Sequence, residues 1–364
     1  MEQPEKLIII GNHHDAWCFG AADPGSGTAI FLEVVRIFGE LRKIGWRPLR
    51  SILFASWDGE EYNLIGSTEH VEARIDEYRR NGFAYLNVDV GVNGPDFKAA
   101  ASPALSTALL HVLERVTDPT TNKSLRAAWA DAGAEVEGLG AGSDYVAFMD
   151  LAGTSSLDMS FEGGPSPYHS CYDNFDWMND YGDEGFQYHK TMAQIWALLI
   201  LDLTDRELLP FDFNAYAEAV RGYVADLEKY TKDKNGDLDF TALGSAAREF
   251  TDNAREFHEW NQAWSNLVYG EGGGFESNAM AIKRLSHNTR MANFETNMLD
   301  IDGGLVGRSQ YKHVIFAPQA WNGYDAAFFP GIRDAIEEGD WEGAQRQVEK
   351  VAGILSFASR KLNH

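Results

Sequence analysis

The hydrophobic positions in the N-terminal half of the chain fall into two alternating patterns. Near-continuous apolar runs at 7–10, 51–57 and 83–88 are typical of strands buried on both faces of a parallel sheet. Between these runs, segments 25–44 and 67–80 carry apolar residues at the spacing of an amphipathic helix. Strands that alternate with helices predict an α/β fold in which helices flank a mostly parallel sheet.

The pattern changes after about residue 207. Strand-like runs fade, and long segments with helical periodicity follow, one centred on Val224 and another on Leu355. A chain of 364 residues has room for about two domains of roughly 150 residues each. We therefore expect an α/β domain over 1–207 and an all-α bundle over 208–364, in which the apolar faces around Val224 and Leu355 are packed.

The charge of the chain limits what it can bind. It contains 31 Lys and Arg residues against 55 Asp and Glu residues, which gives a formal net charge of −24. A field of this sign repels the phosphate backbone, so we expect no nucleic-acid partner. The longest strongly apolar stretch, 195–203, is far shorter than the roughly 20 residues of a membrane span, so we expect no span in this chain.

The sequence leaves the cellular compartment open. No targeting leader is recognisable in the first residues. The two cysteines, Cys18 and Cys171, cannot form a disulfide scaffold and do not identify the redox compartment. We interpret both as small, buried hydrophobic side chains.

Polar side chains follow each predicted strand, at the edge where parallel strands place their ligands. His13 ends the first strand, and Asp23 follows it along the chain. Glu61 lies after the second strand, Asp89 ends the third, and His169 lies in a loop rich in Gly and Pro. A single such residue is usually a helix cap or a surface charge. Together they form a ligand set that zinc accepts, and two ions about 3.5 to 4 Å apart need a bridging carboxylate.

Four separated stretches carry more specific motifs. They are NHHDAW at 12–17 with DPGSG at 23–27, FASWDGEE at 54–61, PYHS at 167–170 and HVIFAP at 313–318. In identity and order these motifs resemble the family of dizinc exopeptidases that includes glutamate carboxypeptidase II and the transferrin receptor. The resemblance runs nearly end to end. It implies a zinc-peptidase domain with a mixed, mostly parallel sheet flanked by helices, followed by an all-α dimerisation domain.

Carried over residue by residue, the resemblance implies two Zn²⁺ ions per chain. It makes His13 and Asp89 ligands of one ion. It makes Glu61 and His169 ligands of the other, and Asp23 the carboxylate that bridges both. In this family the bridging aspartate precedes a cis peptide bond. The residue that follows the aspartate here is Pro24, so we predict a cis bond there.

The resemblance also assigns catalytic roles. Glu60 matches the general base that takes a proton from the attacking water and passes it to the leaving amine. Asp15 matches the acid that orients His13. Tyr168 matches a donor of a hydrogen bond to the tetrahedral oxyanion.

Substrate-binding positions depart from the family pattern. Gly323 and Tyr324 stand where glutamate carboxypeptidase II has a Lys and Tyr pair that grips a C-terminal glutamate, so half of this clamp is missing. Ser143 stands where the family has an asparagine, and the stretch 157–159 replaces an arginine patch. We therefore expect the preference for C-terminal glutamate to be lost.

The start of the chain departs as well. Family members carry an N-terminal segment and an apical (protease-associated) domain before the first zinc ligand, and neither is recognisable here. We expect the chain to be a fragment, an isoform or a truncated gene model. For a full-length form, the resemblance suggests an extracellular, vacuolar or secretory location.

The sequence therefore predicts a dizinc metallopeptidase of the carboxypeptidase type that hydrolyses short peptides and forms a homodimer through its helical domain. Two alternatives stay open. One is a non-catalytic dimeric scaffold, as in the transferrin receptor branch, and the other is an aminopeptidase that uses the same metals. The complete set of five ligand-competent residues favours an enzyme over a scaffold. The sequence does not distinguish a carboxypeptidase from an aminopeptidase.

Overall fold

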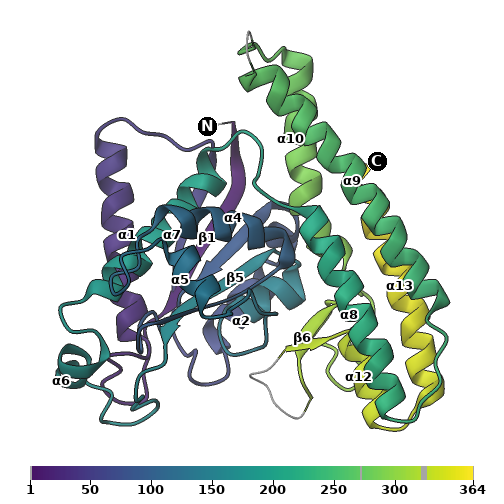
Figure 1. The fold of residues 1–364 in the computed structure, drawn as a ribbon, viewed down its shortest axis with the longest axis horizontal. Helices are drawn as coiled ribbons and strands as arrows, with labels where there is room; N and C mark the ends of the chain where they lie inside the picture. Colours follow the sequence, from purple (N-terminus) through teal and green to yellow (C-terminus); the bar gives the residue numbers. More distant parts are fainter. Residues whose placement is uncertain (1, 271–272, 321–325, 364) are drawn as a thin grey trace.

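The fold of the N-terminal half is built on a five-stranded sheet with the order β2-β1-β3-β5-β4 (Figure 1). The structure is a computed structural model that describes residues 2–270, 273–320 and 326–363. The strands are β1 (Gln3–His13), β2 (Arg50–Trp57), β3 (Gly82–Asn87), β4 (Asp96–Ala101) and β5 (Ser156–Glu162). All neighbours pair in parallel except β4, which is antiparallel to β5 at the edge. The mixed, mostly parallel sheet is confirmed.

Helices cover both faces of this sheet. They are α1 (Gly25–Lys43), α2 (Ile65–Ala73), α3 (Ile75–Asn81), α4 (Pro103–Arg115), α5 (Leu125–Asp131), the π-helix η1 (Ala147–Ala152), α6 (Phe175–Trp177), the π-helix η2 (Met178–Gly182) and α7 (Gln187–Asp205). Phe54 on β2 contacts Phe31 of α1, whereas Trp57 contacts Phe148 of η1. Because successive side chains of a strand point to opposite faces, α1 and η1 lie on opposite sides of the sheet.

The prediction of one helix over 67–80 was wrong, because the structure has two. Arg74 separates α2 from α3 with φ −129° and ψ 24°, outside the helical range. Its backbone N–H donates to the carbonyl of Val71, three residues back, and the chain turns there. Val71 and Tyr78 are both buried, so the apolar spacing of a single helix persists across the break.

The C-terminal half is mostly helical. Its helices are α8 (Phe213–Asp233), α9 (Thr241–Tyr269), α10 (Asn278–Ala292), α11 (Phe294–Asn297), α12 (Pro330–Glu337) and α13 (Trp341–Asn363). The long helices α8 and α13 both pack against α9 (Figure 1). Val224 on α8 and Leu355 on α13 are buried, as predicted. Among the described residues, no helix combines the length and the apolar character that a membrane crossing needs.

Two details differ from the predicted all-α domain. One detail is a small antiparallel pair of strands, β6 (Phe316–Pro318) and β7 (Ala326–Phe328). This pair lies beside α8, where the ring of Phe328 stacks on Tyr223 with centroids 3.7 Å apart. The buried apolar residues of both halves also form one continuous core. The domain boundary between residues 207 and 208 therefore stays a prediction.

A buried carboxylate joins the two halves. Glu295 in α11 accepts hydrogen bonds from Ser102 at the start of α4, from the Tyr216 hydroxyl of α8 (2.8 Å) and from Nε2 of His313 (2.9 Å). Glu295 and His313 have no exposed surface. Nδ1 of His313 accepts two backbone N–H groups from the segment that follows it, so the ring proton is on Nε2, facing the carboxylate.

We predict that Glu295→Ala lowers the free energy of unfolding by about 3 to 5 kcal/mol, because it leaves His313 and two hydroxyl groups buried without their acceptor. Urea denaturation followed by circular dichroism measures this change. Glu33→Ala is the control, since Glu33 forms an exposed pair with Arg36 and its loss should change stability little. Equal effects of the two substitutions would contradict a special role for the buried carboxylate.

Candidate metal centre

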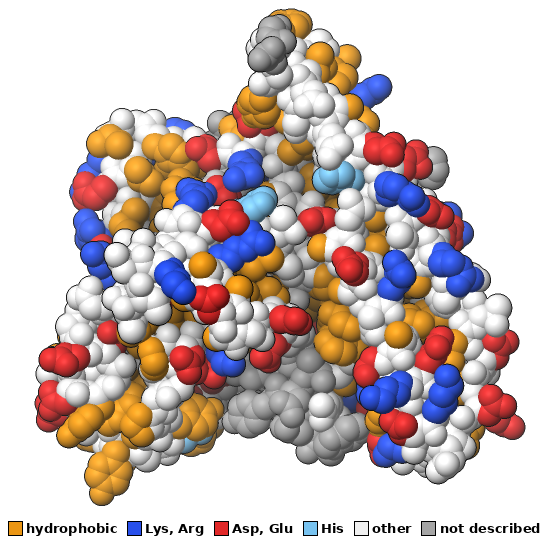
Figure 2. Space-filling model, in the orientation of Figure 1, with side chains coloured by type: hydrophobic (Ala, Val, Ile, Leu, Met, Phe, Trp, Pro, Cys, Tyr) orange, Lys and Arg blue, Asp and Glu red, His pale blue; other side chains and the backbone are white. Residues whose placement is uncertain are grey.

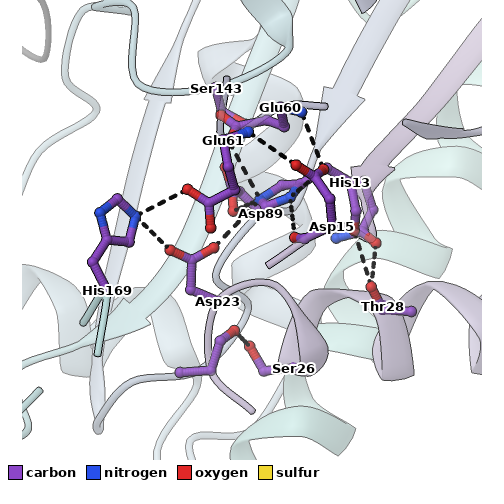
Figure 3. Close-up of polar contacts among 12 residues, drawn as sticks. His13, Asp15, Asp23, Ser26, Thr28, Glu60, Glu61, Asp89, Ser143 and His169 are labelled. Atoms are coloured by element: carbon purple, nitrogen blue, oxygen red, sulfur yellow. Dashed lines mark hydrogen bonds and ion pairs between the residues drawn. The ribbon is translucent and has the colours of Figure 1, made fainter. Parts of the chain in front are cut away.

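The five side chains predicted to bind zinc converge at the carboxyl edge of the sheet (Figure 3). His13 is the last residue of β1, and Asp89 follows the end of β3. Asp23 precedes α1, and Glu61 follows β2. His169 comes from the loop between β5 and α6. Neighbouring parallel strands and the loops that follow them thus bring the five candidate ligands to one edge of the sheet.

The first group of potential ligands surrounds His13. Its Nε2 atom lies 2.7 Å from Oδ1 of Asp89 and 3.4 Å from Oδ1 of Asp23. His13 is only 1% exposed, so these contacts are made inside the protein.

The second group surrounds His169. Its Nε2 atom lies 3.1 Å from Oδ2 of Asp23 and 3.2 Å from Oε2 of Glu61. Asp23 therefore turns one carboxylate oxygen toward each histidine, and it lies between them in Figure 3. In both groups the candidate donor atoms lie within 4.8 Å of one another. The peptide bond from Asp23 to Pro24 is cis, as predicted.

The electrostatics of the two groups fit bound cations. Burial, followed by the charge of Asp23, raises the pKa of Glu61 to about 7. Burial and the charge of Asp89 raise the pKa of Glu60 to about 9. Oε1 of Glu61 is buried and has no hydrogen-bond partner among the described residues. Positive charge nearby stabilises the ionised form of carboxylates that are crowded in this way, and divalent ions would supply that charge.

Asp15 contacts His13 and the backbone of Glu60 and Glu61. Nδ1 of His13 lies 3.1 Å from the backbone carbonyl oxygen of Asp15 and 3.4 Å from its carboxylate. The same carboxylate accepts the backbone N–H groups of Glu60 (3.0 Å) and Glu61 (3.2 Å). Its predicted role of orienting His13 stays a prediction, and the contacts to the Glu60 and Glu61 backbone had not been expected.

The two groups open onto a cavity of about 650 Å³. Glu60 and Tyr168, both predicted to be catalytic, line it, and the ring of Tyr168 stacks on His169 with centroids 3.7 Å apart. Ser143 also lines the cavity and accepts a hydrogen bond from Asn87 (3.0 Å). Tyr311 lines it from the C-terminal half, so both halves contribute to the cavity.

Two of the predicted substrate-binding residues, Gly323 and Tyr324, lie outside the described residues. Their place relative to the cavity stays a prediction.

Asp173 supports the site although no sequence motif had pointed to it. Its buried carboxylate accepts the backbone N–H groups of Ala22 (2.7 Å) and Asp23 (3.0 Å), and it thereby ties the loop of His169 to the backbone of Asp23. Its position four residues after His169 was the available signal. Its partners lie about 150 residues earlier, and only the tertiary fold reveals them.

The interpretation of the two cysteines as buried hydrophobic residues was wrong. Cys18 and Cys171 form a disulfide, and both are exposed. The fold brings their Cα atoms within 5.2 Å although 153 positions separate them in the sequence, and this distance suits a disulfide. The bond links the loop after β1 to the loop that carries His169.

Comparison with known proteins gives the family. A family model described as "Peptidase family M28" matches residues 1–184, half of the chain, and "Transferrin receptor-like dimerisation domain" matches residues 238–363. The probable glutamate carboxypeptidase LAMP1 of Arabidopsis thaliana is 36% identical, over 98% of this chain and 52% of its own length.

Other relatives carry different names. The aminopeptidase NAALADL1 of Mus musculus is 29% identical, over 99% of this chain and 51% of its own length. The inactive zinc metalloprotease C354.09c of Schizosaccharomyces pombe is 28% identical, over 99% of this chain and 45% of its own length. The chain thus spans about half the length of these curated relatives.

The two ligand groups lie within the part of the chain that the peptidase model matches, and the long helices α9 and α13 lie within the part that the dimerisation model matches. The predicted family is therefore confirmed, and the chain belongs to peptidase family M28, whose members are zinc-dependent.

Proposed function

We propose that this chain carries the catalytic centre of a dizinc exopeptidase that hydrolyses short peptides as a carboxypeptidase. The observation that supports this most is the sharing of Asp23, whose two carboxylate oxygens face the two histidines from opposite sides. One carboxylate that serves two ligand groups is the arrangement that a two-metal site requires. His13 and Asp89 would hold one ion, and Glu61 and His169 the other.

Bound zinc polarises a peptide carbonyl and makes a nearby water more acidic. In this proposal Glu60 accepts a proton from the attacking water and donates it to the leaving amine. Asp15 keeps Glu60 in place through its backbone N–H group. Tyr168, at the rim beside His169, donates a hydrogen bond to the oxyanion that forms on the substrate.

Two rival functions share this geometry. An aminopeptidase would use the same metals and differ only in the peptide terminus that it holds, and one relative carries that name. A non-catalytic scaffold is the other rival, and one relative is named inactive. The presence of all five ligand-competent side chains, with Glu60 lining the same cavity, supports an enzyme over a scaffold.

The cavity supports a change in substrate preference. Asp158 and Glu162 of β5 line it, and Asn87 donates a hydrogen bond to Asp158 (2.8 Å) that fixes this carboxylate. No Lys or Arg occurs among the described residues that line the cavity. The predicted partner positions, Gly323 and Tyr324, carry no positive charge. We therefore propose that neutral or basic residues are accepted more readily than C-terminal glutamate.

We further propose a homodimer that pairs through the helical half. The match to the dimerisation model supports it, as do large apolar side chains around the projecting end of α9 and α10 (Figure 2). Phe275 and Ile282 are 79% and 68% exposed there. Surfaces of this kind on soluble proteins often mark protein contacts.

The dimer predicts a mass of twice 40.5 kDa in light scattering at micromolar concentration. Ile282→Asp should shift the mass toward the single chain if this apolar surface takes part. A single-chain mass of the unaltered protein at all concentrations tested would contradict the dimer.

For the metal centre, we predict that Asp23→Asn lowers the affinity for both ions by at least about tenfold, because one carboxylate serves both groups. Elemental analysis after dialysis against a zinc buffer measures the metal content. Glu61→Gln is the matched comparison, since it should weaken one ion only. A content of no more than one zinc per unaltered chain would sink the two-metal proposal.

Glu60→Gln completes this set as the catalytic control. The amide keeps the shape of the side chain but accepts no proton, so turnover should fall about a hundredfold to ten-thousandfold while both metals stay bound. Retained turnover in the metal-loaded variant would place the base elsewhere.

A peptide panel tests the substrate preference. We predict that N-acetylated dipeptides with a C-terminal glutamate are cleaved no faster than those ending in neutral or basic residues. Gly323 stands where a lysine would bind a carboxylate of the C-terminal glutamate, and the absence of this contact, worth about 1.5 to 3 kcal/mol, accounts for the lost preference. C-terminal amides should resist cleavage. Strong selectivity for glutamate would contradict the predicted preference, and a strict requirement for a free N-terminus would identify an aminopeptidase instead.

A further inference from the structure

We propose that Cys18 and Cys171 are positioning residues for the second metal-ligand group, and that reduction of their disulfide weakens that group selectively. The inference rests on the proposed two-metal centre. It concerns the group formed by Asp23, Glu61 and His169, and not the group formed around His13.

The two histidines are held in different ways. His13 ends a strand that pairs on both sides, with β2 and with β3, and its side chain is 1% exposed. His169 lies in a loop, and its side chain is 34% exposed. Its backbone has φ +55°, in the left-handed region that residues other than glycine adopt uncommonly. The second group therefore depends on contacts that hold this loop.

Contacts of this loop with neighbouring rings lie beside the disulfide. The rings next to His169 belong to Tyr168 and Trp17, and both are about half exposed. Trp17 immediately precedes Cys18, so the covalent bond also holds the ring that packs against His169. Cys171 follows His169 by two residues, which makes the disulfide the nearest covalent tie of this ligand to the loop after β1.

A second tie limits what reduction can do. The buried carboxylate of Asp173 holds the backbone of Ala22 and Asp23, independently of the cysteines. The base of the loop therefore stays attached when the disulfide is open. The segment around His169 loses its nearest anchor, whereas the sheet and the group around His13 keep theirs.

The disulfide is open to chemical reduction because both cysteines are exposed. A small dithiol breaks the bond between the two sulfur atoms and transfers two electrons and two protons to them. The products are the two thiols of Cys18 and Cys171 and the cyclic disulfide of the reagent. Air oxidation of the two thiols restores the bond.

Zinc titration against a competing chelator tests the proposal on the full chain, without a peptide substrate. The reduced protein is prepared with dithiothreitol and then desalted, because the reagent binds zinc. It is kept under argon so that the thiols stay reduced, and it is compared with the oxidised protein. We expect reduction to weaken one of the two ions by about 10- to 100-fold, the range typical for loss of a group that orients a ligand. The affinity for the other ion should stay unchanged.

Two variants make the test specific. Cys18→Ser combined with Cys171→Ser should show the reduced behaviour from the start and no response to dithiothreitol. Tyr172→Ser changes an exposed neighbour in the same loop and should leave both affinities unchanged. Equal zinc affinities in the oxidised protein and the double variant would overturn the proposal, as would an equal loss of both ions.

The result separates this inference from the proposed function. Binding of two ions with a selective response to reduction, but without peptide cleavage by the oxidised protein, would refute the peptidase and leave the positioning role standing. Peptide cleavage by a protein that binds two ions with affinities unchanged by reduction of the disulfide would support the peptidase and refute the positioning role.

Discussion

The structure depends on holding mutually repelling carboxylates together at one edge of a sheet. Asp23, Glu60, Glu61 and Asp89 meet there beside two histidines, and burial with like charge raises the pKa of Glu60 to about 9 and that of Glu61 to about 7. Such crowding opposes folding unless positive charge compensates it or stability elsewhere in the fold offsets it. The parallel pairing of β1 with β2 and β3 holds the strand ends in place, and the predicted ligand set fits cations that would supply the charge.

The scaffold does not hold all the predicted ligands in the same way. His13 is fixed by strand pairing, whereas His169 reaches the same carboxylate from a loop. Loops carry functional residues because they tolerate irregular backbone, but they need separate anchors to place a side chain accurately. Here the disulfide partner Cys171 and the carboxylate of Asp173, both just after His169 in the sequence, provide these anchors.

The helical half contributes to the same centre. Tyr311 lines the cavity, and Glu295 accepts hydrogen bonds from groups of both halves in a fully buried cluster. Polar groups buried in this way are stable only when each has its partner, so the cluster also specifies how the halves fit together. The cavity between them therefore depends on contacts that lie far from the ligands.

The sequence by itself determined the local features and, through its motifs, the family. Apolar runs predicted β1, β2 and β3. The residues that end or follow these strands, together with His169 from a loop motif, are the five side chains that the structure brings together. Periodicity did not reveal the break at Arg74, because the buried positions keep their helical spacing across it. Only the tertiary structure decided that Cys18 and Cys171 bond to each other and that Asp173 supports Asp23. These contacts join residues about 150 positions apart, and no local pattern of hydrophobicity or charge encodes a distance in space between such residues.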